Sequence, residues 1–147
     1  MKVYKATMED VKGVAHLFHL YRVFYEQQSN VEEAERYLSE RLTKSESVIF
    51  VAKEKDTYVG FVQLYPTFSS VSMTRTWILN DLYVLQEARK NGIAQLLLDK
   101  VKQFALDTGA KSIHLETGPD NKIAQSLYEK NGYQKDNIYV RYSLPLA

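Results

Sequence analysis

The hydrophobic and polar positions of the first fifty residues follow a helical period. Apolar side chains recur every three or four positions after Thr7 and again after Asn30, as on the buried face of an amphipathic helix. Thr7 and Asn30 are favourable N-cap residues, and Asp10 stands where a capping box places an acidic side chain. The pattern predicts one helix that begins near Thr7 and ends near Tyr25, and a second that follows Asn30.

Runs of β-branched and aromatic residues predict strands around these helices. The turn between the predicted strands Ser47–Lys53 and Tyr58–Tyr65 is short, which favours an antiparallel hairpin. We expect Pro66 to end the third strand and the serine-rich segment 67–74 to form a loop. The predicted strands are Val3–Ala6, Ser47–Lys53, Tyr58–Tyr65, Arg75–Val84, Ser112–Glu116 and Ile138–Leu144.

Two further helices are predicted in the second half of the chain. One runs from Gly92 to Gly109 and buries Ile93, Leu96, Leu97, Val101 and Phe104, and a shorter one covers Asn121–Lys130. The strand–helix–strand order of 77–116 implies a parallel pair with a right-handed crossover. The sequence therefore predicts an α/β fold, in which a mixed, mostly antiparallel sheet of about six to seven strands is flanked by four helices.

The composition is that of an ordinary globular protein. With 147 residues, 45% hydrophobic and 25% charged, we expect a single domain over residues 1–147. The net charge of +1 gives no sign of a general nucleic-acid or membrane surface. The absence of cysteine excludes disulfides and thiolate metal sites, and the three histidines show no metal-ligand spacing. The N-terminus lacks a signal peptide's apolar run, so we expect a cytoplasmic protein.

The basic turn Arg89–Ala94 joins the strand that ends at Val84 to the helix that begins at Ile93. Unpaired N–H groups and the dipole at a helix start attract an anion, and Gly92 lets a ligand approach the backbone. Most turns of this kind are only connections, so the turn alone favours a structural role. The chain has neither Gly-x-Gly-x-x-Gly nor Gly-Lys-Ser/Thr, which excludes Rossmann and Walker phosphate binding.

Two blocks of the sequence resemble one family. Arg89-x-x-Gly92-x-Ala94, between a strand and a long helix, resembles the Gln/Arg-x-x-Gly-x-Gly/Ala signature of the GCN5-related N-acetyltransferases. The block Asn121–Tyr133 resembles the family's Asn-x-x-Ala-x-x-Leu-Tyr-x-x-x-Gly-Tyr/Phe segment. The similarity spans essentially the whole chain. The segment Leu79–Val84 looks most like the polyamine-acetyltransferase branch.

The resemblance implies acetyl-CoA as the cofactor. In this family, main-chain N–H groups of the turn hold the pyrophosphate, and the central strand splays from its parallel neighbour so that its edge pairs with the pantetheine arm. The resemblance also places Tyr128 near the sulfur, and many relatives are dimers, which implies a homodimer. The cofactor-binding residues expected on this basis are Leu82, Tyr83, Val84, Arg89, Lys90, Asn91, Gly92, Ile93, Ala94, Gln95 and Asn121.

Acetyl transfer to an amine needs a base for the amine, donors for the oxyanion and an acid for the thiolate. Tyr128 is the predicted catalytic acid, because the phenol pKa of about 10 lies above the roughly 8.5 of a thiol. Asp81 is the predicted catalytic base, with Glu116 or a water molecule as alternatives. Asn80 stands where related polyamine enzymes carry a glutamate, and an amide cannot take that role.

The acceptor amine is expected between the two early helices and the segment that follows Pro66. Carboxylates and tyrosine rings suit a cationic amine. We expect transfer of the acetyl group to a primary amine of a small molecule by direct attack in a ternary complex. The alternatives are a protein or peptide amine acetyltransferase, with a more open groove, and a non-catalytic acyl-CoA-binding module. The residues expected to bind the acceptor are Tyr21, Tyr25, Glu26, Phe68, Asn80 and Glu116.

Overall fold

The structure is a computed structural model that describes all residues from Met1 to Ala147. It divides into two compact units, Met1–Glu116 and Thr117–Ala147, and each is described by itself. The first unit holds the sheet and three helices, and the second holds one short helix. None of the helices has both the length and the apolar character that a membrane span requires.

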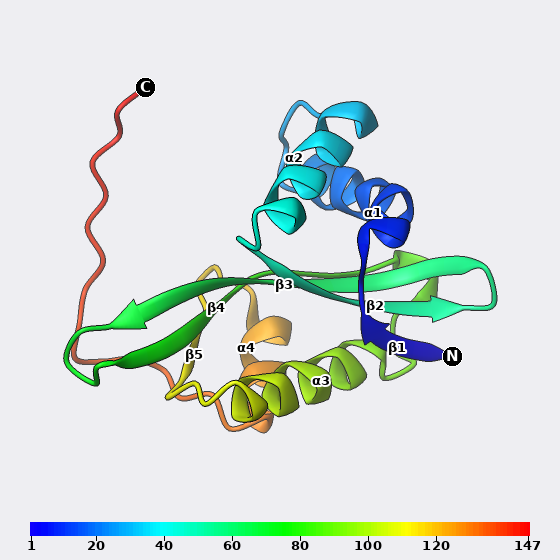
Figure 1. Ribbon diagram of the computed structural model, residues 1–147. Helices are drawn as coiled ribbons and strands as arrows, with labels where there is room; N and C mark the ends of the chain where they lie inside the picture. Colours follow the sequence, from blue (N-terminus) through cyan, green and yellow to red (C-terminus); the bar gives the residue numbers. More distant parts are fainter. The chain divides into compact units, whose positions relative to one another are not determined.

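The sheet of the first unit has five strands in chain order (Figure 1). The first four pair antiparallel, and the last two are parallel, which confirms a mixed and mostly antiparallel sheet. The strand number is lower than the roughly six to seven expected. The strands are β1 (Lys2–Lys5), β2 (Val48–Glu54), β3 (Thr57–Ser69), β4 (Thr74–Val84) and β5 (Ile113–His114).

Three helices cover the two faces of this sheet. Figure 1 shows α1 (Val11–Phe24) and α2 (Val31–Thr43) on one face and α3 (Ile93–Asp107) on the other. The predicted caps are confirmed: the Thr7 N–H donates to Asp10 Oδ2 over 2.9 Å, and the Glu33 N–H donates to Asn30 Oδ1 over 2.7 Å. Under α1 and α2 lies a core that includes Leu17, Phe18, Leu38, Ile49, Val51 and Phe61.

Helix α3 turns a slightly different face to the sheet than predicted. Leu96 is 42% exposed, whereas Leu98 is buried. The other buried residues of this helix are Ile93, Leu97, Val101 and Ala105. The prediction of Leu96 as a core residue was therefore wrong, because a run of three leucines leaves the helical phase ambiguous by one position.

Strand β3 continues through Pro66 to Ser69, so the prediction that Pro66 ends it was wrong. The ladder between β2 and β3 stops at Leu64, while β3 keeps pairing with β4 as far as Ser69. Pro66 therefore lies where β3 is an edge on the β2 side. A proline, which lacks an N–H, is tolerated at an edge. The predicted loop is reduced to the tip of a long β3–β4 hairpin.

The second unit contains α4 (Lys122–Lys130), which begins at the predicted cap Asn121. Gly132 has a φ of +91°, a conformation that favours glycine after a helix. The prediction of a last strand at Ile138–Leu144 was wrong, because residues 134–147 form no strand. Alternating apolar residues favour a strand, but a strand also needs a neighbour to pair with.

Asp10 joins three elements of the first unit. Its Oδ1 accepts hydrogen bonds from Tyr4 of β1 and Tyr58 of β3, each at 2.7 Å, and its Oδ2 accepts the Thr7 N–H. Burial opposes ionisation of Asp10, but the hydrogen bonds outweigh it and lower the pKa of this carboxyl. Asp10 is therefore a buried anion with three donors.

We expect Asp10→Asn to lower the free energy of unfolding at pH 7 by about 1–3 kcal/mol, because buried donors lose a charged acceptor. The pKa of Asp10 is lower in the folded state than in the unfolded state. The ionised carboxylate therefore contributes its full stabilisation above the unfolded-state pKa, and this stabilisation is lost as pH falls through the folded-state pKa. Urea unfolding from pH 7 down to pH 3 measures both effects. The difference in unfolding free energy between the wild type and Asp10→Asn should become smaller below about pH 4.

The matched control is Glu9→Gln, an exposed acidic residue in the same turn. It should change the unfolding free energy by less than about 0.5 kcal/mol. An equal loss in both variants would contradict a specific role for the Asp10 hydrogen bonds.

Candidate active site

The parallel strands β4 and β5 are paired over only two positions. Trp77 lies opposite Ile113 and Ile78 opposite His114, and no further pair follows. Strand β4 continues for six more residues to Val84, paired on one side with β3. Its other edge, from Leu79 to Val84, has no strand partner. A polar chain such as a pantetheine arm can bond to an edge of this kind as an added strand does.

The turn after this edge is tied by its own side chains. Arg89 Nε donates to the Val84 carbonyl over 2.9 Å, and the Arg89 guanidinium carbon lies 5.7 Å from the centre of the Tyr83 ring. Asn91 Nδ2 donates to the Ala88 carbonyl over 3.1 Å. Lys90 has a positive φ of 67°, which is uncommon for this residue type. Arg89 and Asn91 therefore stabilise the turn, while Lys90 is exposed.

Gly92 is the N-cap of α3 and leaves the helix start open. Its φ is +75°, no side chain caps the helix, and a Cβ built there would meet no atom within 4 Å. The first N–H groups of a helix have no intrahelical acceptor, and the helix dipole makes this end positive. The space beside Gly92 therefore suits a phosphate group, so this turn fits the pyrophosphate of the cofactor that the sequence implies.

Asp81 is the buried carboxylate of this region, at 5% exposure. Its Oδ2 accepts from Gln63 Nε2 over 2.8 Å, and its Oδ1 accepts from Asn80 Nδ2 over 3.1 Å. Burial raises the pKa of Asp81, and hydrogen bonds from Gln63, Asn80 and Tyr21 oppose this rise. Asp81 therefore has a carboxyl group that is easier to protonate than an ordinary aspartate.

A β-bulge positions this carboxylate. Gln63 lies opposite Asp81 but Leu64 lies opposite Leu79, so Asn80 is the extra residue in β4. A bulge of this kind locally re-aims side chains and increases strand twist. It places Asp81 on the same face as its cross-strand partner Gln63, while Asn80 is exposed beside it.

The Tyr21 ring, which is linked to Asp81, belongs to a cluster of aromatic rings. The Tyr21 ring centre lies 5.0 Å from that of Tyr25, 6.1 Å from that of Phe61 and 6.2 Å from that of Tyr83. Tyr21 also hydrogen-bonds to Asp81. Because Tyr83 contacts both Tyr21 and Arg89, the group connects the buried carboxylate to the turn. The structure thus brings Tyr21, Tyr25 and Asp81 together.

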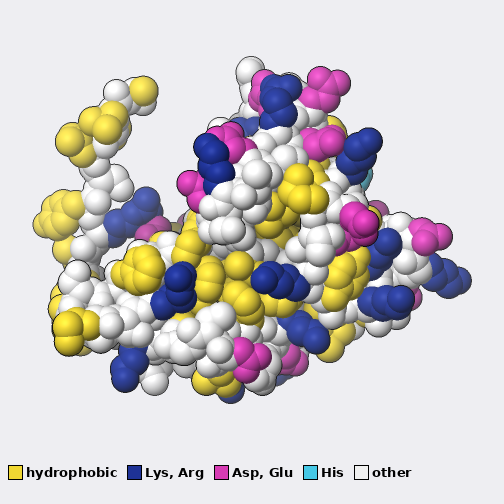
Figure 2. Space-filling view, viewed as in Figure 1, with side chains coloured by type: hydrophobic (Ala, Val, Ile, Leu, Met, Phe, Trp, Pro, Cys, Tyr) yellow, Lys and Arg dark blue, Asp and Glu magenta, His cyan; other side chains and the backbone are white.

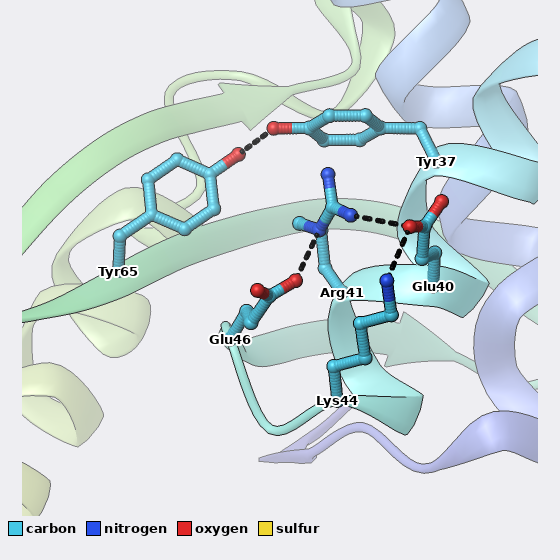
Figure 3. Close-up of polar contacts among 6 residues, drawn as sticks. All are labelled: Tyr37, Glu40, Arg41, Lys44, Glu46 and Tyr65. Atoms are coloured by element: carbon cyan, nitrogen blue, oxygen red, sulfur yellow. Dashed lines mark hydrogen bonds and ion pairs between the residues drawn. The ribbon is translucent and has the colours of Figure 1, made fainter.

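A second polar group lies further along β3 (Figure 3). The hydroxyls of Tyr37 from α2 and Tyr65 from β3 are 2.7 Å apart. The Arg41 guanidinium lies over the Tyr37 ring at 4.9 Å and pairs with Glu40 and Glu46. Burial, the hydrogen bond with Tyr37 and the charge of Asp81 raise the pKa of Tyr65, so its hydroxyl stays protonated at neutral pH.

Gln63 and Tyr37 were not predicted as site residues. A signal for Gln63 existed, because the strand period places it on the same face as Phe61. A single glutamine inside the apolar run from Val59 to Leu64 was the visible sign. Tyr37 gave no such sign, since a tyrosine on an amphipathic helix is ordinary.

Three expected acceptor residues lie apart from Asp81 or near the ends of their elements. Phe68 is 70% exposed with the Arg75 guanidinium 4.9 Å above its ring. It lies five residues beyond Gln63, which is about 17 Å along a strand, so the structure does not bring it to Asp81. Glu26 is exposed just after α1, and Glu116 lies two residues beyond β5.

The remaining two predicted residues belong to the second unit. Asn121 Oδ1 accepts the Ala124 N–H over 3.1 Å, so this oxygen caps α4. Tyr128 is half-buried on α4, and its ring centre lies 5.6 Å from that of Tyr133. Both side chains are therefore held by contacts within their own unit.

Comparison with known proteins agrees with this geometry. The uncharacterized N-acetyltransferase YhfO of Bacillus subtilis (strain 168) is 47% identical over 144 residues, which cover 98% of this chain and 97% of that protein. The crystal structure of a probable acetyltransferase superposes with a TM-score of 0.94 at 43% identity, covering 100% of this chain and 99% of that chain.

The fold is also that of a predicted acetyltransferase from Clostridium acetobutylicum, whose crystal structure includes acetyl-CoA. It has a TM-score of 0.79 at 20% identity and covers 97% of this chain and 95% of that chain. The model of the Acetyltransferase (GNAT) family matches residues 14–133. With most of its length matched in this way, the chain belongs to the acetyltransferase (GNAT) family.

Proposed function

We propose that this protein transfers an acetyl group from acetyl-CoA to a primary amine of a small molecule. The observation that supports the proposal is the buried carboxylate of Asp81 on a strand whose free edge leads to the turn at Gly92. A nucleotide-bearing donor needs the turn and the edge, and a protonated amine needs a base. The three features lie in one continuous stretch of chain, 79–95.

The donor-binding residues follow from this stretch. The open helix start at Gly92, with Ile93, Ala94 and Gln95, offers N–H groups to the pyrophosphate, and Lys90 adds charge. The β4 edge at Leu82, Tyr83 and Val84 offers main-chain groups to the pantetheine arm. Arg89 and Asn91 hold the turn in shape. The family resemblance adds Asn121, whose Oδ1 caps α4, to the proposed cofactor-binding residues.

Acetyl-CoA supplies the thioester whose acetyl group is transferred. Asp81 takes a proton from the amine, directly or through a water molecule, because an ammonium has no lone pair with which to attack. Its raised pKa suits this role, since a base works best when its pKa lies near the working pH. Gln63, Asn80 and Tyr21 orient the two carboxylate oxygens.

Tyr128 is proposed as the acid that would give a proton to the thiolate, the role that the family resemblance implies. Its phenol is protonated at neutral pH and has a higher reference pKa than a thiol, so the transfer is favourable. The N–H groups near Val84 would stabilise the oxyanion, and one such donor is worth about 3 kcal/mol of barrier.

The acceptor amine lies against Tyr21, Tyr25 and Asn80 in this proposal. Tyrosine rings attract a cation before it is deprotonated. A polyamine is one acceptor of this kind, and the likeness of Leu79–Val84 to the polyamine branch supports testing it first. We also propose that the protein acts in the cytoplasm as a homodimer, the state that the family resemblance implies.

One observation favours a second candidate, a protein or peptide amine acetyltransferase. A small-molecule site closed by the β3–β4 hairpin would bury Phe68 against α1. Phe68 is instead 70% exposed, and Val71 and Met73 at the hairpin tip are 98% and 90% exposed. A site that the hairpin does not close would leave room for an extended peptide.

A thiol-release assay tests the proposed function and separates the two candidates. Acetyl-CoA is incubated with the protein and a panel of polyamines, amino acids, aminoglycosides and peptides. We expect at least one small amine to accelerate thiol release in proportion to its acetylated product. Acceleration by peptides alone would support the second candidate, and tight acetyl-CoA binding without release by any amine would indicate a non-catalytic module.

The Tyr128→Phe variant provides the internal control for the acid. It removes one oxygen, so we expect kcat to fall by about 10²-fold with little change in acetyl-CoA affinity. Tyr133→Phe, a neighbouring tyrosine of the same unit, should leave kcat nearly unchanged. A Tyr128→Phe enzyme with the wild-type kcat would exclude Tyr128 as the acid.

A further inference from the structure

The hydroxyls of Tyr37 and Tyr65 form a polar contact that no step of the proposed mechanism uses. They lie 2.7 Å apart, and either one can be the donor (Figure 3). Each tyrosine has one O–H group, and the single hydrogen bond between them uses only one of the two. The pair therefore keeps one O–H group that can donate to a ligand, and the donating hydroxyl keeps lone pairs that can accept from one.

Tyr65 lies on the same face of the sheet as Asp81. It follows Gln63, which donates to Asp81 Oδ2 over 2.8 Å, by two residues of β3, and alternate residues of a strand share a face. Two residues of a strand span about 7 Å. Burial, the hydrogen bond with Tyr37 and the charge of Asp81 raise the pKa of Tyr65, so the carboxylate is near enough to act on this hydroxyl. An acceptor whose amine meets Asp81 can therefore reach the pair with a second polar group.

The Tyr37–Tyr65 pair is accessible from solvent. The ladder between β2 and β3 stops at Leu64, so no residue of β2 pairs with Tyr65. Helix α2 packs mainly against α1. Tyr37 is 39% exposed, and Tyr65 is half-buried. The hydrogen bond between the two hydroxyls is accordingly exposed, so a ligand can add to it or replace it.

The charged residues beside the pair balance one another. The Arg41 guanidinium lies 4.9 Å from the centre of the Tyr37 ring. Arg41 forms ion pairs with Glu40 over 3.1 Å and with Glu46 over 2.9 Å, and Lys44 pairs with Glu40 over 2.8 Å. Figure 2 shows side chains of both signs next to one another over the helices at the top of the view. Balanced charges attract neither a second ammonium nor a carboxylate, so the pair suits a neutral polar group.

We propose that the Tyr37–Tyr65 pair binds a hydroxyl group of the acceptor, and that the acceptor is a primary amine with a hydroxyl about 7 Å from its nitrogen. A hydroxyl both donates and accepts, so it matches the O–H group and the lone pairs that the pair keeps. This inference deepens the proposed function and rests on it, because Asp81 is taken as the group that receives the amine. Tyr37 and Tyr65 are specificity-determining residues in this arrangement and take no part in proton transfer.

Three amines of equal length test this assignment, because they differ only in the end that would meet the pair. Aminobutanol with its two groups at opposite ends carries a hydroxyl there, pentylamine a methyl group and putrescine a second amine. We expect the wild-type kcat/KM for aminobutanol to exceed that for each of the other two by about 10-fold, a difference typical of one hydrogen bond. A preference for putrescine or for pentylamine would overturn the proposal.

The Tyr65→Phe variant removes one hydroxyl of the pair and keeps the ring. We expect its preference for aminobutanol over pentylamine to fall below about 2-fold, with kcat/KM for pentylamine nearly unchanged. A purely structural role would change kcat/KM for both amines alike and leave their ratio as it was. The matched control is Tyr58→Phe, which also removes a hydrogen-bonded hydroxyl from β3 but lies about 23 Å away along the strand, and it should keep the wild-type ratio.

Failure of this inference differs from failure of the proposed function. If the wild type acetylates amines without favouring aminobutanol, or if Tyr65→Phe keeps the preference, the inference is wrong and the proposed function stands. If no amine accelerates thiol release, the proposed function is wrong, and titration calorimetry of the three amines with CoA-saturated protein still tests the pair. Tighter binding of aminobutanol that is lost in Tyr65→Phe would support the site, whereas equal or undetectable binding of the three amines would overturn it.

Discussion

Replacing Gly92 with glutamate should weaken acetyl-CoA binding by about 100-fold or more. The side chain places a negative charge at the start of α3, where the proposed pyrophosphate lies, and at an effective dielectric constant of about 20 two charges about 4 Å apart interact by roughly 4 kcal/mol. The substitution clashes with nothing, because no atom lies within 4 Å of the new Cβ. Titration calorimetry with acetyl-CoA measures the loss directly.

The φ of +75° adds a second effect that must be separated from charge. A residue with a Cβ costs about 1–2 kcal/mol in this conformation whatever its side chain is. Gly92→Gln has the same strain and nearly the same volume as Gly92→Glu but no charge. We therefore expect its affinity to lie between those of the wild type and Gly92→Glu.

The opposite end of the same helix supplies a position control. Gly109 has a φ of +71° and also has no atom within 4 Å of a built Cβ. Gly109→Glu should lower thermal stability about as much as Gly92→Glu while leaving acetyl-CoA affinity unchanged. If Gly92→Glu bound acetyl-CoA as the wild type does, or if Gly109→Glu lost affinity equally, the turn would not be the phosphate site.

The turn was predictable because its features are local. A glycine after a strand, basic neighbours and an apolar-faced helix all lie within a few residues, and the structure shows the positive φ and the open cap. The helix starts at Thr7 and Asn30 were predictable for the same reason, since a cap depends on residues three positions apart. What the turn binds was not contained in those residues and came from the resemblance of two separate blocks.

The surroundings of Asp81 were less predictable because they depend on register. The sequence suggested Asp81 as a base but did not reveal that Gln63, eighteen residues earlier, donates to it. That contact requires the β3–β4 pairing and the bulge at Asn80, and a one-residue slip would turn every side chain to the other face. The predictions at Pro66 and at Ile138–Leu144 were wrong for a related reason. Whether a segment forms a strand depends on the neighbour with which it pairs, and the local sequence does not show that neighbour.

Asp81→Asn should lower kcat by about 10²- to 10⁴-fold and remove the acidic limb of the pH–rate profile. The amide keeps the shape of the side chain and one acceptor oxygen for Gln63 or Asn80, but it cannot take a proton from the amine. In the wild type the limb should lie above the ordinary range of aspartate, since burial raises the pKa of Asp81. Steady-state rates from pH 5 to pH 9, with the amine found in the thiol-release assay, measure both quantities.

A stability measurement separates loss of chemistry from loss of structure. The folded pKa of Asp81 is raised, so this carboxyl favours the folded state below its unfolded pKa, and that contribution is lost as pH rises through the folded pKa. At pH 7 the buried charge is therefore a cost, which Asp81→Asn removes. We expect its free energy of unfolding to be no lower than that of the wild type, and acetyl-CoA affinity to be retained.

Glu116→Gln is the matched comparison, because Glu116 is the alternative base. If Asp81 is the base, Glu116→Gln should keep both the acidic limb and most of kcat. The reverse result, a full-rate Asp81→Asn enzyme and a Glu116→Gln enzyme without its acidic limb, would assign the proton transfer to Glu116. If both variants kept the acidic limb, neither carboxylate would be the general base. A water molecule would then accept the proton, and Asp81 would only orient the Tyr21 ring beside it.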